Sequence, residues 1–240
     1  MSAAPERAED EAMAATTSLA VGPLAFVADA CGALVDADER VLLVADLHLE
    51  KGSAYAARGM LLPPYDSRAT LALLAQAVRR WQPRLVVALG DTLHDRGAAA
   101  RIAQDDLATL AGLQAGRDWI WLTGNHDPDP VPALGGTVAA ELALGGVMLR
   151  HEPRPGETGP EIAGHLHPAG KVRLRGRAVR RRCFVSDGRR CVMPAFGTYA
   201  GGLNVLDGAF SPLFAGRRFT AHMLGAGRVY AVAGHQLSPD

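Results

Sequence analysis

The chain has 240 residues, of which 48 % are hydrophobic and 21 % are charged. These values are typical of a globular protein and argue against a disordered, collagen-like or coiled-coil chain. The 25 basic and 25 acidic residues balance, but the two signs are segregated along the chain. Residues 1–20 are rich in alanine and acidic, so we expect a mobile N-terminal tail followed by a single domain over 21–240.

The three cysteines form no C-x-x-C pair, which argues against a disulfide framework or a zinc ribbon. A reduced, cytoplasmic setting is the simplest expectation. The N-terminal residues lack the positive start and apolar run of a secretory signal, and no stretch reaches the roughly 18 apolar residues of a membrane helix. We therefore expect no membrane contact.

Three short apolar runs predict buried strands, at 41–45, 85–89 and 119–122. Between them, helices are predicted over 66–80 and 102–113, the first capped by Asp66 or Ser67. Strands that alternate with helices in this way indicate a largely parallel, covered sheet.

Helical periodicity fades after Gly135, where short strands separated by glycine and proline take over. We expect these strands at about 137–150, 161–164, 171–185, 190–206 and 227–233. The change in pattern indicates a second sheet packed against the first.

Polar residues follow each of the three early strands at its carboxyl end. The segments are Asp46-Leu47-His48, Gly90-Asp91-Thr92-Leu93-His94-Asp95 and Gly124-Asn125-His126-Asp127. Later in the chain come His151 and Gly164-His165-Leu166-His167. In open α/β sheets, ligands bind outside the carboxyl ends of the strands. Asp, Asn and His together are a ligand set that suits Mn²⁺, Fe or Zn²⁺.

The spacing within these segments has a physical interpretation. In an extended segment, residues i and i+2 point the same way, so Asp46 and His48 could hold one ion, and His165 and His167 repeat the spacing. The glycines that precede three of the candidate ligands are expected to allow sharp turns. A single D-x-H arises by chance, but five such elements in this order indicate a metal site.

The order of these blocks resembles the calcineurin-like metallophosphoesterase superfamily, whose pattern is D-x-H, G-D, G-N-H-D/E, H and G-H-x-H. Three longer strings are similar to the ligase-associated DNA damage response endonuclease subfamily, PdeM: DLHLEKGSAYAARG, LGDTLHD and FGTYAGGLNV. The resemblance implies an α/β fold, a four-layer α/β/β/α sandwich in which two packed mixed sheets are flanked by helices.

The same resemblance implies a site with two divalent metal ions, for which the mixed ligand set favours Mn²⁺ over Fe or Zn²⁺. One ion would be bound by Asp46, His48, Asp91 and His167. The other would be bound by Asp91, Asn125, His151 and His165, so that Asp91 bridges the two. His126 would act as the catalytic residue at the leaving oxygen, and Asp127 would orient it.

The segment 171–190 contains nine basic residues and a single acid, Asp187, which gives a local charge of nine minus one, +8. On a strand, Arg173, Arg175 and Arg177 would share one face, where they could bind a phosphate backbone. The alternative is a solvated hairpin that keeps a sheet edge soluble. Three further residues near the metal blocks are expected to contact the substrate: Lys51, Arg58 and His94.

From these observations we predict a DNA phosphodiesterase, an endonuclease acting on single-stranded or flap DNA in repair. The resemblance implies a repair ligase, a helicase and a second nuclease as partners besides DNA. Two alternatives remain open. One is a phosphoesterase for small phosphomonoesters, cyclic nucleotides or nucleotide pyrophosphates, against which only the basic segment argues. The other is a non-catalytic scaffold, against which the complete set of ligands argues.

Overall fold

The computed structural model describes residues 16–60, 62–129 and 131–240. The first sheet contains seven strands whose spatial order follows the chain. They are β1 (Thr16–Val21), β2 (Leu24–Asp29), β3 (Leu34–Asp36), β4 (Val41–Val44), β5 (Leu85–Ala88), β6 (Asp118–Leu122) and β7 (Thr137–Ala139). The pairs from β1 to β4 are antiparallel, and the pairs from β4 to β7 are parallel. The predicted strands β4, β5 and β6 are confirmed.

The expectation of a mobile tail over 1–20 is wrong for residues 16–20, which belong to β1 and pair with β2. Leu19 and Val21 are buried among the apolar side chains between the two sheets. Alternate residues of this segment therefore contribute to the core. The prediction missed this pattern because the segment follows directly on an acidic stretch. Residues 1–15 lie outside the described residues, and for them the tail stays a prediction.

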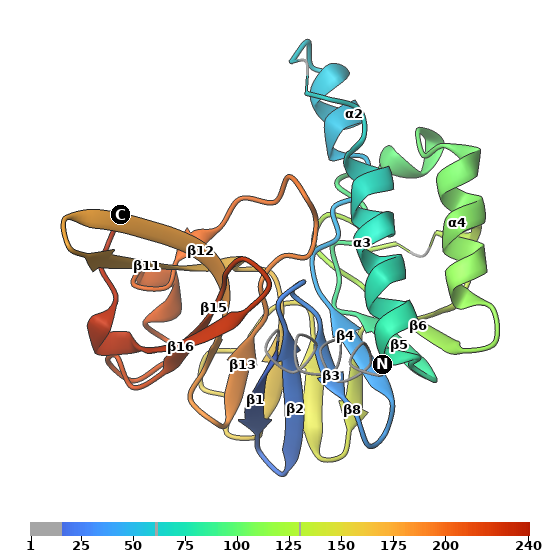
Figure 1. Cartoon of the computed structure of the whole chain (residues 1–240). Coiled ribbons are helices and arrows are strands. Elements are labelled where there is room, and N and C mark those ends of the chain that lie inside the picture. The colour runs from blue at the N-terminus through green and yellow to red at the C-terminus, as the bar shows by residue number, and fades with distance from the viewer. Residues whose placement is uncertain (1–15, 61, 130) are drawn as a thin grey trace, which may run out of the picture.

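Three α-helices lie beside the first sheet: α2 (Lys51–Ala56), α3 (Asp66–Trp81) and α4 (Gln104–Gln114) (Figure 1). The predicted helices α3 and α4 are confirmed to within two residues at each end. Leu71 and Leu74 of α3 pack with Leu110 of α4 against Leu42 and Val86 of the sheet. This apolar layer covers the outer face of the first sheet and fixes the ends of its central strands.

The second sheet is built from the later part of the chain and contains both parallel and antiparallel pairs. Its strands are β8 (Glu141–Leu144), β9 (Val147–Arg150), β10 (Glu161–Ala163), β11 (Pro168–Leu174), β12 (Arg177–Ser186), β13 (Arg190–Val192), β14 (Leu203–Asn204), β15 (Thr220–Leu224) and β16 (Val229–Ala233). The sequence did not predict β15, which pairs with β12 and β16.

Apolar side chains fill the space between the two sheets, with Phe26 and Leu43 from the first and Leu149 and Phe184 from the second. The α/β fold with two packed mixed sheets is thereby confirmed. The fourth layer is thinner than a helical layer. In the described part of the chain, the outer face of the second sheet is covered by the segment 204–219, which contains one 3₁₀ turn, Gly208–Phe210.

Two projections rise from the edge of the molecule at which β4 and β5 end (Figure 1). One carries α2, which begins three residues after the candidate ligand His48. The other is the β11–β12 hairpin, which begins directly after the candidate ligand His167. Within the described residues, no helix is both long and apolar enough to cross a membrane.

Candidate metal centre

The first two ligand segments lie side by side beyond the ends of β4 and β5. The amide of Asp46 donates to the carbonyl of Gly90 (3.2 Å), and the amide of His48 donates to the carbonyl of Asp91 (2.9 Å). These bonds continue the parallel pairing of the two strands. The predicted convergence of polar residues at the carboxyl ends of the strands is therefore seen in the structure.

Five of the seven expected ligands have left-handed backbone conformations: Asp46, His48, Asp91, His165 and His167, with φ between 45° and 68°. The expectation that D-x-H is an extended segment is therefore wrong. Asp46 and His48 both adopt positive φ and converge on one cluster, whereas His165 and His167, which also have positive φ, face different clusters. Each such non-glycine residue costs about 1–3 kcal/mol, a strain that typically accumulates at functional sites.

The three glycines act in two different ways. Gly90 adopts φ +76°, as a sharp turn requires. Gly124 and Gly164 do not need positive φ, and they serve instead for close approach. A Cβ on Gly124 would lie 2.2 Å from Asp91 Oδ1, and a Cβ on Gly164 would lie 2.6 Å from Asp46 Oδ2. The two glycines let the backbone pass directly beside the buried carboxylates.

Donor atoms of Asp46, His48 and His167 form the first cluster, within 4.8 Å of one another. His48 Nε2 and His167 Nε2 are 3.1 Å apart, and His167 Nε2 is 3.5 Å from Asp46 Oδ1. The Asp46 carboxylate also accepts a hydrogen bond from the His165 amide at 3.0 Å. This cluster contains three of the four residues expected at the first ion.

Asp91, His151 and His165 form the second cluster. His151 Nε2 lies 3.4 Å from Asp91 Oδ1, 3.0 Å from Asn125 Oδ1 and 3.2 Å from His165 Nδ1. The other oxygen of Asp91, Oδ2, lies 3.9 Å from His48 Nε2 in the first cluster. The two oxygens of Asp91 thus face different clusters, which is the arrangement a bridging ligand needs.

The chemistry of these residues fits two divalent cations. Asp46 and Asp91 are buried, at 0 % and 2 % exposure, and their side chains contact imidazoles rather than any Lys or Arg in the described residues. Two pairs of imidazole nitrogens also face each other at 3.1–3.2 Å. Buried carboxylates and converging nitrogen lone pairs are both satisfied by metal coordination.

Burial acts to raise the pKa of Asp91, but hydrogen bonding to His151 and to the His126 amide outweighs it and lowers the pKa to about 2. For His151, burial acts to lower the pKa, but its bond to Asp91 and the charges of Asp46 and Asp91 raise it to about 9. Burial and repulsion from His167 lower the pKa of His48 to about 3. Because a metal ligand must be deprotonated, His151 would have to release a proton if it held an ion.

His126 lies beside the clusters, and its side chain is 36 % exposed. Its Nδ1 is 2.6 Å from the carbonyl of His94, and its ring stacks on the His94 ring at 5.3 Å. The expectation that Asp127 orients this ring is wrong. The carboxylate of Asp127 accepts a hydrogen bond from the Leu93 amide (3.0 Å), and burial raises its pKa to about 6. The His94 carbonyl positions His126, while Asp127 holds the 91–94 loop.

All of the expected substrate contacts except His94 lie on the two projections. Lys51 is half-buried at the start of α2, Arg58 is exposed just beyond it, and His94 lies 5.4 Å from the His48 ring. Burial, together with repulsion from Lys51, lowers the pKa of His94. His94 therefore belongs to the site itself, where its ring nitrogen approaches those of His48 and His126.

The expected ladder of Arg173, Arg175 and Arg177 on one strand face is wrong. Arg173 lies on β11, Arg177 begins β12, and Arg175 (φ 49°) and Gly176 (φ 78°) form the turn between them. Two consecutive residues with positive φ are typical of a two-residue hairpin turn. All three arginines are exposed at the hairpin tip and have no ion pair among the described residues.

The local charge of +8 is also only partly available to a ligand. Lys171 and Arg180 are near Asp240, at 3.8 Å and 3.0 Å, and Arg182 donates to the carbonyl of Ala195. Arg190 is buried and bonded to Glu161. Of the remaining exposed charges, Arg173, Arg175 and Arg177 lie at the hairpin tip, and Arg181 and Arg189 lie away from it.

Two supports of the site were not predicted. Phe196 and Gly197 donate to the carbonyls of Ala45 and Asp46, at 2.8 Å and 3.2 Å, and so brace the first ligand segment. A Cβ on Gly197 would lie 2.3 Å from the Leu47 carbonyl, so the glycine of the FGTY string was the signal available in the sequence.

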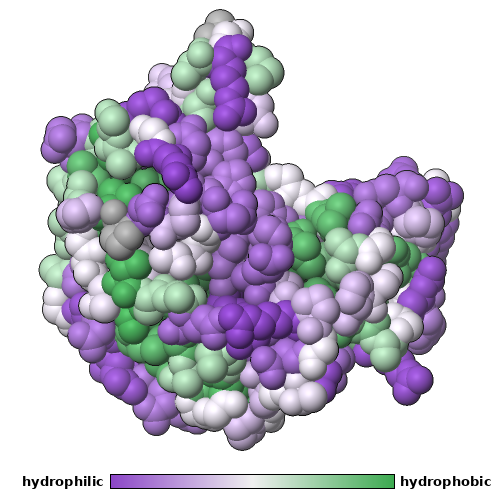
Figure 2. Space-filling model, turned by 180° about the vertical axis from the view of Figure 1, so that it is seen from behind, coloured by the Kyte–Doolittle hydropathy of each residue, from purple (hydrophilic) through white to green (hydrophobic). Residues whose placement is uncertain are grey.

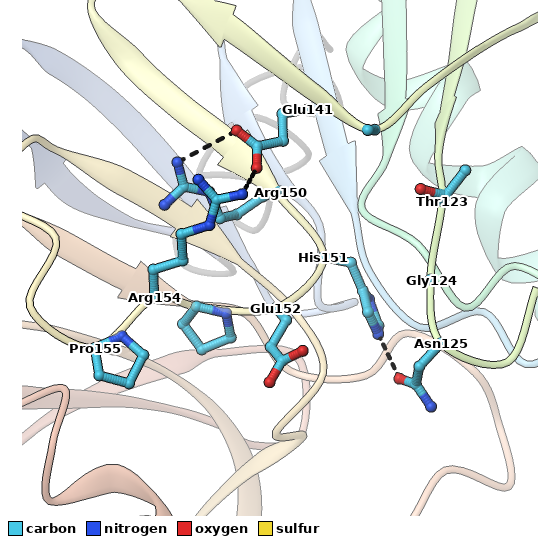
Figure 3. A pocket seen from close by; sticks show the side chains of 11 residues that line it. Thr123, Gly124, Asn125, Glu141, Arg150, His151, Glu152, Arg154 and Pro155 are labelled. Carbon is cyan, nitrogen blue, oxygen red and sulfur yellow. Dashed lines mark hydrogen bonds and ion pairs between the residues drawn. The ribbon is translucent and has the colours of Figure 1, made fainter. Parts of the chain in front are cut away.

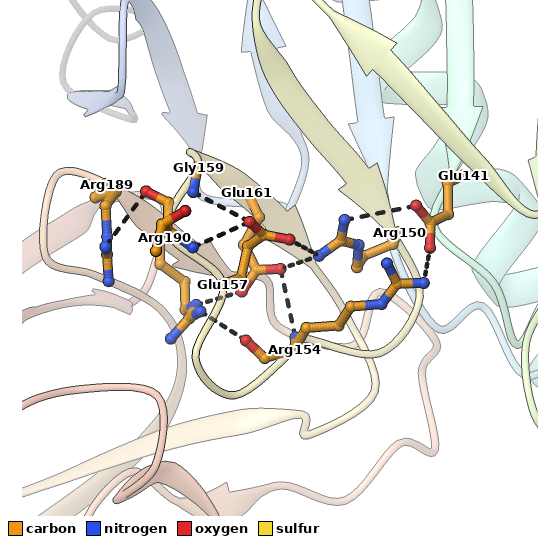
Figure 4. A network of polar contacts seen from close by, with 9 residues as sticks. Glu141, Arg150, Arg154, Glu157, Gly159, Glu161, Arg189 and Arg190 are labelled. Atoms are coloured by element: carbon orange, nitrogen blue, oxygen red, sulfur yellow. Dashed lines mark hydrogen bonds and ion pairs between the residues drawn. The ribbon is translucent and has the colours of Figure 1, made fainter.

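The second support is a network of ion pairs behind His151 (Figure 4). Arg150 Nη1 donates to the buried carboxylate of Glu161 (2.7 Å), to which Arg190 also donates. The second guanidinium nitrogen of Arg150 is 3.5 Å from Glu141. No spacing in the sequence indicates these pairs, because their members are spread over 50 residues.

Residues 39–172 match the calcineurin-like phosphoesterase family. Among solved structures, the chain is similar to the nuclease MPE of Pseudomonas putida, with 31 % identity and a TM-score of 0.69, covering 90 % of this chain and 100 % of that one. It is also similar to the phosphoesterase Yfce of E. coli, with 14 % identity and a TM-score of 0.41, covering 80 % and 98 %. A comparison with curated proteins gave no match. The chain belongs to the calcineurin-like phosphoesterase family.

Proposed function

We propose that this protein is a two-metal-dependent phosphodiesterase that cleaves DNA internally, with Mn²⁺ as its preferred ion. The observation that carries the proposal is the position of the two clusters between basic projections. Lys51 and Arg58 lie on one side and the arginines of the hairpin tip lie on the other. The similarity to a protein described as a nuclease supports the same conclusion.

The surface between the projections is hollowed; hydrophilic residues cover its centre, and a hydrophobic patch borders it (Figure 2). A hollow that is open to solvent leaves room for a polymer, whereas an enclosed cavity would select a small ester. The hairpin arginines can bind phosphates of such a polymer without reading bases. The breadth of the hollow and its exposed arginines favour a nucleic-acid backbone over a small phosphomonoester.

Asp46, His48, Asp91 and His167 would hold one ion, and Asp91, Asn125, His151 and His165 would hold the other. When bound, the ions supply Lewis acidity that orients the phosphate and makes a water molecule a better nucleophile. His126 would donate a proton from Nε2 to the leaving oxygen, because its Nδ1 is already engaged by the His94 carbonyl. Asp127 holds the loop that carries this carbonyl.

To test the proposal, the purified protein is incubated with Mn²⁺ and each of three substrates: circular single-stranded DNA, duplex DNA and a chromogenic phosphodiester. Cleavage of the circular strand is expected, because only an endonuclease opens a circle, and EDTA should abolish it. Hydrolysis of the chromogenic ester without DNA cleavage would instead identify a small-substrate phosphoesterase. We also propose that the protein acts in DNA repair with a ligase, a helicase or a second nuclease as partners. A pull-down from cells in which repair has been induced tests this part of the proposal.

A further inference from the structure

A pocket of about 390 Å³ opens directly beside the second cluster. Asn125 and His151, two candidate ligands, form part of its wall. Figure 3 shows Thr123 and Asn125 on one side of the pocket and Glu141 and Arg154 on the other, with His151 between them. A group bound here would therefore extend from a phosphate held at the two clusters.

The wall opposite Asn125 is an irregular loop that the ion-pair network holds in place (Figure 4). The carbonyl of Arg154 accepts a hydrogen bond from Arg190 (2.8 Å), and its amide is 3.4 Å from a Glu161 carboxylate oxygen. Glu161 and Arg190 are 0 % and 2 % exposed. The pocket is thus fixed before a ligand arrives, which reduces the entropy lost on binding.

The charges of the lining residues indicate what the pocket would bind. Both of its guanidinium groups, those of Arg150 and Arg154, are paired with Glu141. The pocket therefore has no free cation for a second phosphate. Besides the carboxylate of Glu152, it offers apolar surface from Ala140, Pro153 and Pro155 and hydrogen-bonding groups such as the Thr123 hydroxyl. This combination, and the volume, suit an uncharged, partly apolar group with donors and acceptors.

We propose that the pocket binds the nucleoside that remains attached to the scissile phosphate after cleavage. His126, to which the proposed function assigns the leaving oxygen, belongs to the group with His48 and His94, whereas the pocket adjoins Asn125 and His151. The leaving group of the phosphodiester would therefore lie on the His126 side of the candidate metal centre, and the retained nucleoside would lie on the side of the pocket. This inference rests on the proposed phosphodiesterase function and adds the subsite that recognises the substrate.

The test compares the p-nitrophenyl ester of thymidine 5′-monophosphate with methyl p-nitrophenyl phosphate. Both release p-nitrophenolate, but only the first carries a nucleoside. Ala140→Trp fills the pocket from an exposed position, and Ala111→Trp adds the same side chain to the exposed surface of α4. The wild type is expected to prefer the nucleoside ester, and Ala140→Trp should reduce that preference in kcat/KM about tenfold or more. Ala111→Trp should leave it unchanged.

Equal kcat/KM values for the two esters in the wild type, or equal losses on both in Ala140→Trp, would overturn the proposal. If neither ester is hydrolysed, the proposed function fails, and binding alone then decides about the pocket. Thymidine should bind the metal-free wild type and Ala111→Trp about tenfold more tightly than Ala140→Trp, measured by calorimetry. Equal affinity of all three proteins for thymidine, or no detectable binding of thymidine by any of them, would show that the pocket is not a nucleoside site.

Discussion

At the scale of single residues, His126 is distinguished from its neighbours by its exposure and by its contact with a carbonyl. We expect His126→Ala to keep both ions and to lose roughly 10²–10⁴-fold in turnover of DNA, because an alkoxide is a poor leaving group that needs a proton. The loss on a p-nitrophenyl ester should be much smaller. Steady-state kinetics on both substrates, with metal content measured in the same samples, checks this prediction.

Two outcomes would reassign His126. An equal loss on both substrates would argue against a general acid, and loss of an ion would make the residue a ligand. The second outcome has a structural basis, because ring nitrogens of His48, His94 and His126 lie within 4.8 Å of one another.

Gly124 is the residue whose missing side chain matters most to the site. In Gly124→Ala the new Cβ would lie 2.2 Å from Asp91 Oδ1 and 2.3 Å from the Asp91 amide, so the bridging carboxylate must move. Metal affinity or activity should fall by about 10–100-fold, the usual effect of disturbing a ligand's support. Gly112→Ala is the matched control, because Gly112 lies on α4 with open space around it. Its activity should be unchanged, and a Gly112→Ala variant that loses as much would refute the argument.

At the scale of elements, the β11–β12 hairpin places three exposed arginines at its tip. Neutralising Arg173, Arg175 and Arg177 together should raise the KM for DNA and flatten its salt dependence. Each lost phosphate contact changes the slope of log K against log salt by about 0.7 for single strands, so three contacts remove about two units. Neutralising Arg79, Arg217 and Arg218, which are also exposed, controls for net charge. Identical slopes in all proteins would make the hairpin only a soluble edge.

The elements that the sequence predicted are those whose signal is local. β4, β5 and β6 are uninterrupted apolar runs, and α3 has one apolar face, so each was found within two residues. β1 was missed because exposed residues alternate with its buried ones, and β15 was missed because it is short and includes a polar residue, His222, that is nevertheless buried. The ligands were recognised from their order, but their left-handed backbones were not, because the conformation depends on contacts such as that between Gly197 and Asp46, which are remote in sequence.

At the scale of the whole molecule, the candidate ligands are divided between the two sheets. The candidate ligands that follow strands of the first sheet are Asp46, His48, Asp91 and Asn125. Those that follow β9 and β10 of the second sheet are His151, His165 and His167. Bound ions would therefore connect two layers that are otherwise joined mainly by apolar contacts. The sequence placed each ligand at a strand end and assigned the later strands to a second sheet, but it did not show the order of the strands within that sheet.

This division predicts that ions stabilise the fold as well as the reaction. At a free Mn²⁺ concentration about 100 times its Kd, one ion adds about 2.7 kcal/mol to the free energy of unfolding, since it binds only the folded chain. For a chain of this size, that raises Tm by roughly 5–10 °C, measured by calorimetry with Mn²⁺ and with EDTA. Asp91→Ala, which removes the carboxylate facing both clusters, should show little or no shift. An equal shift in Asp91→Ala would mean that the stabilising ions bind elsewhere, and no shift in the wild type would mean that the two sheets do not share an ion.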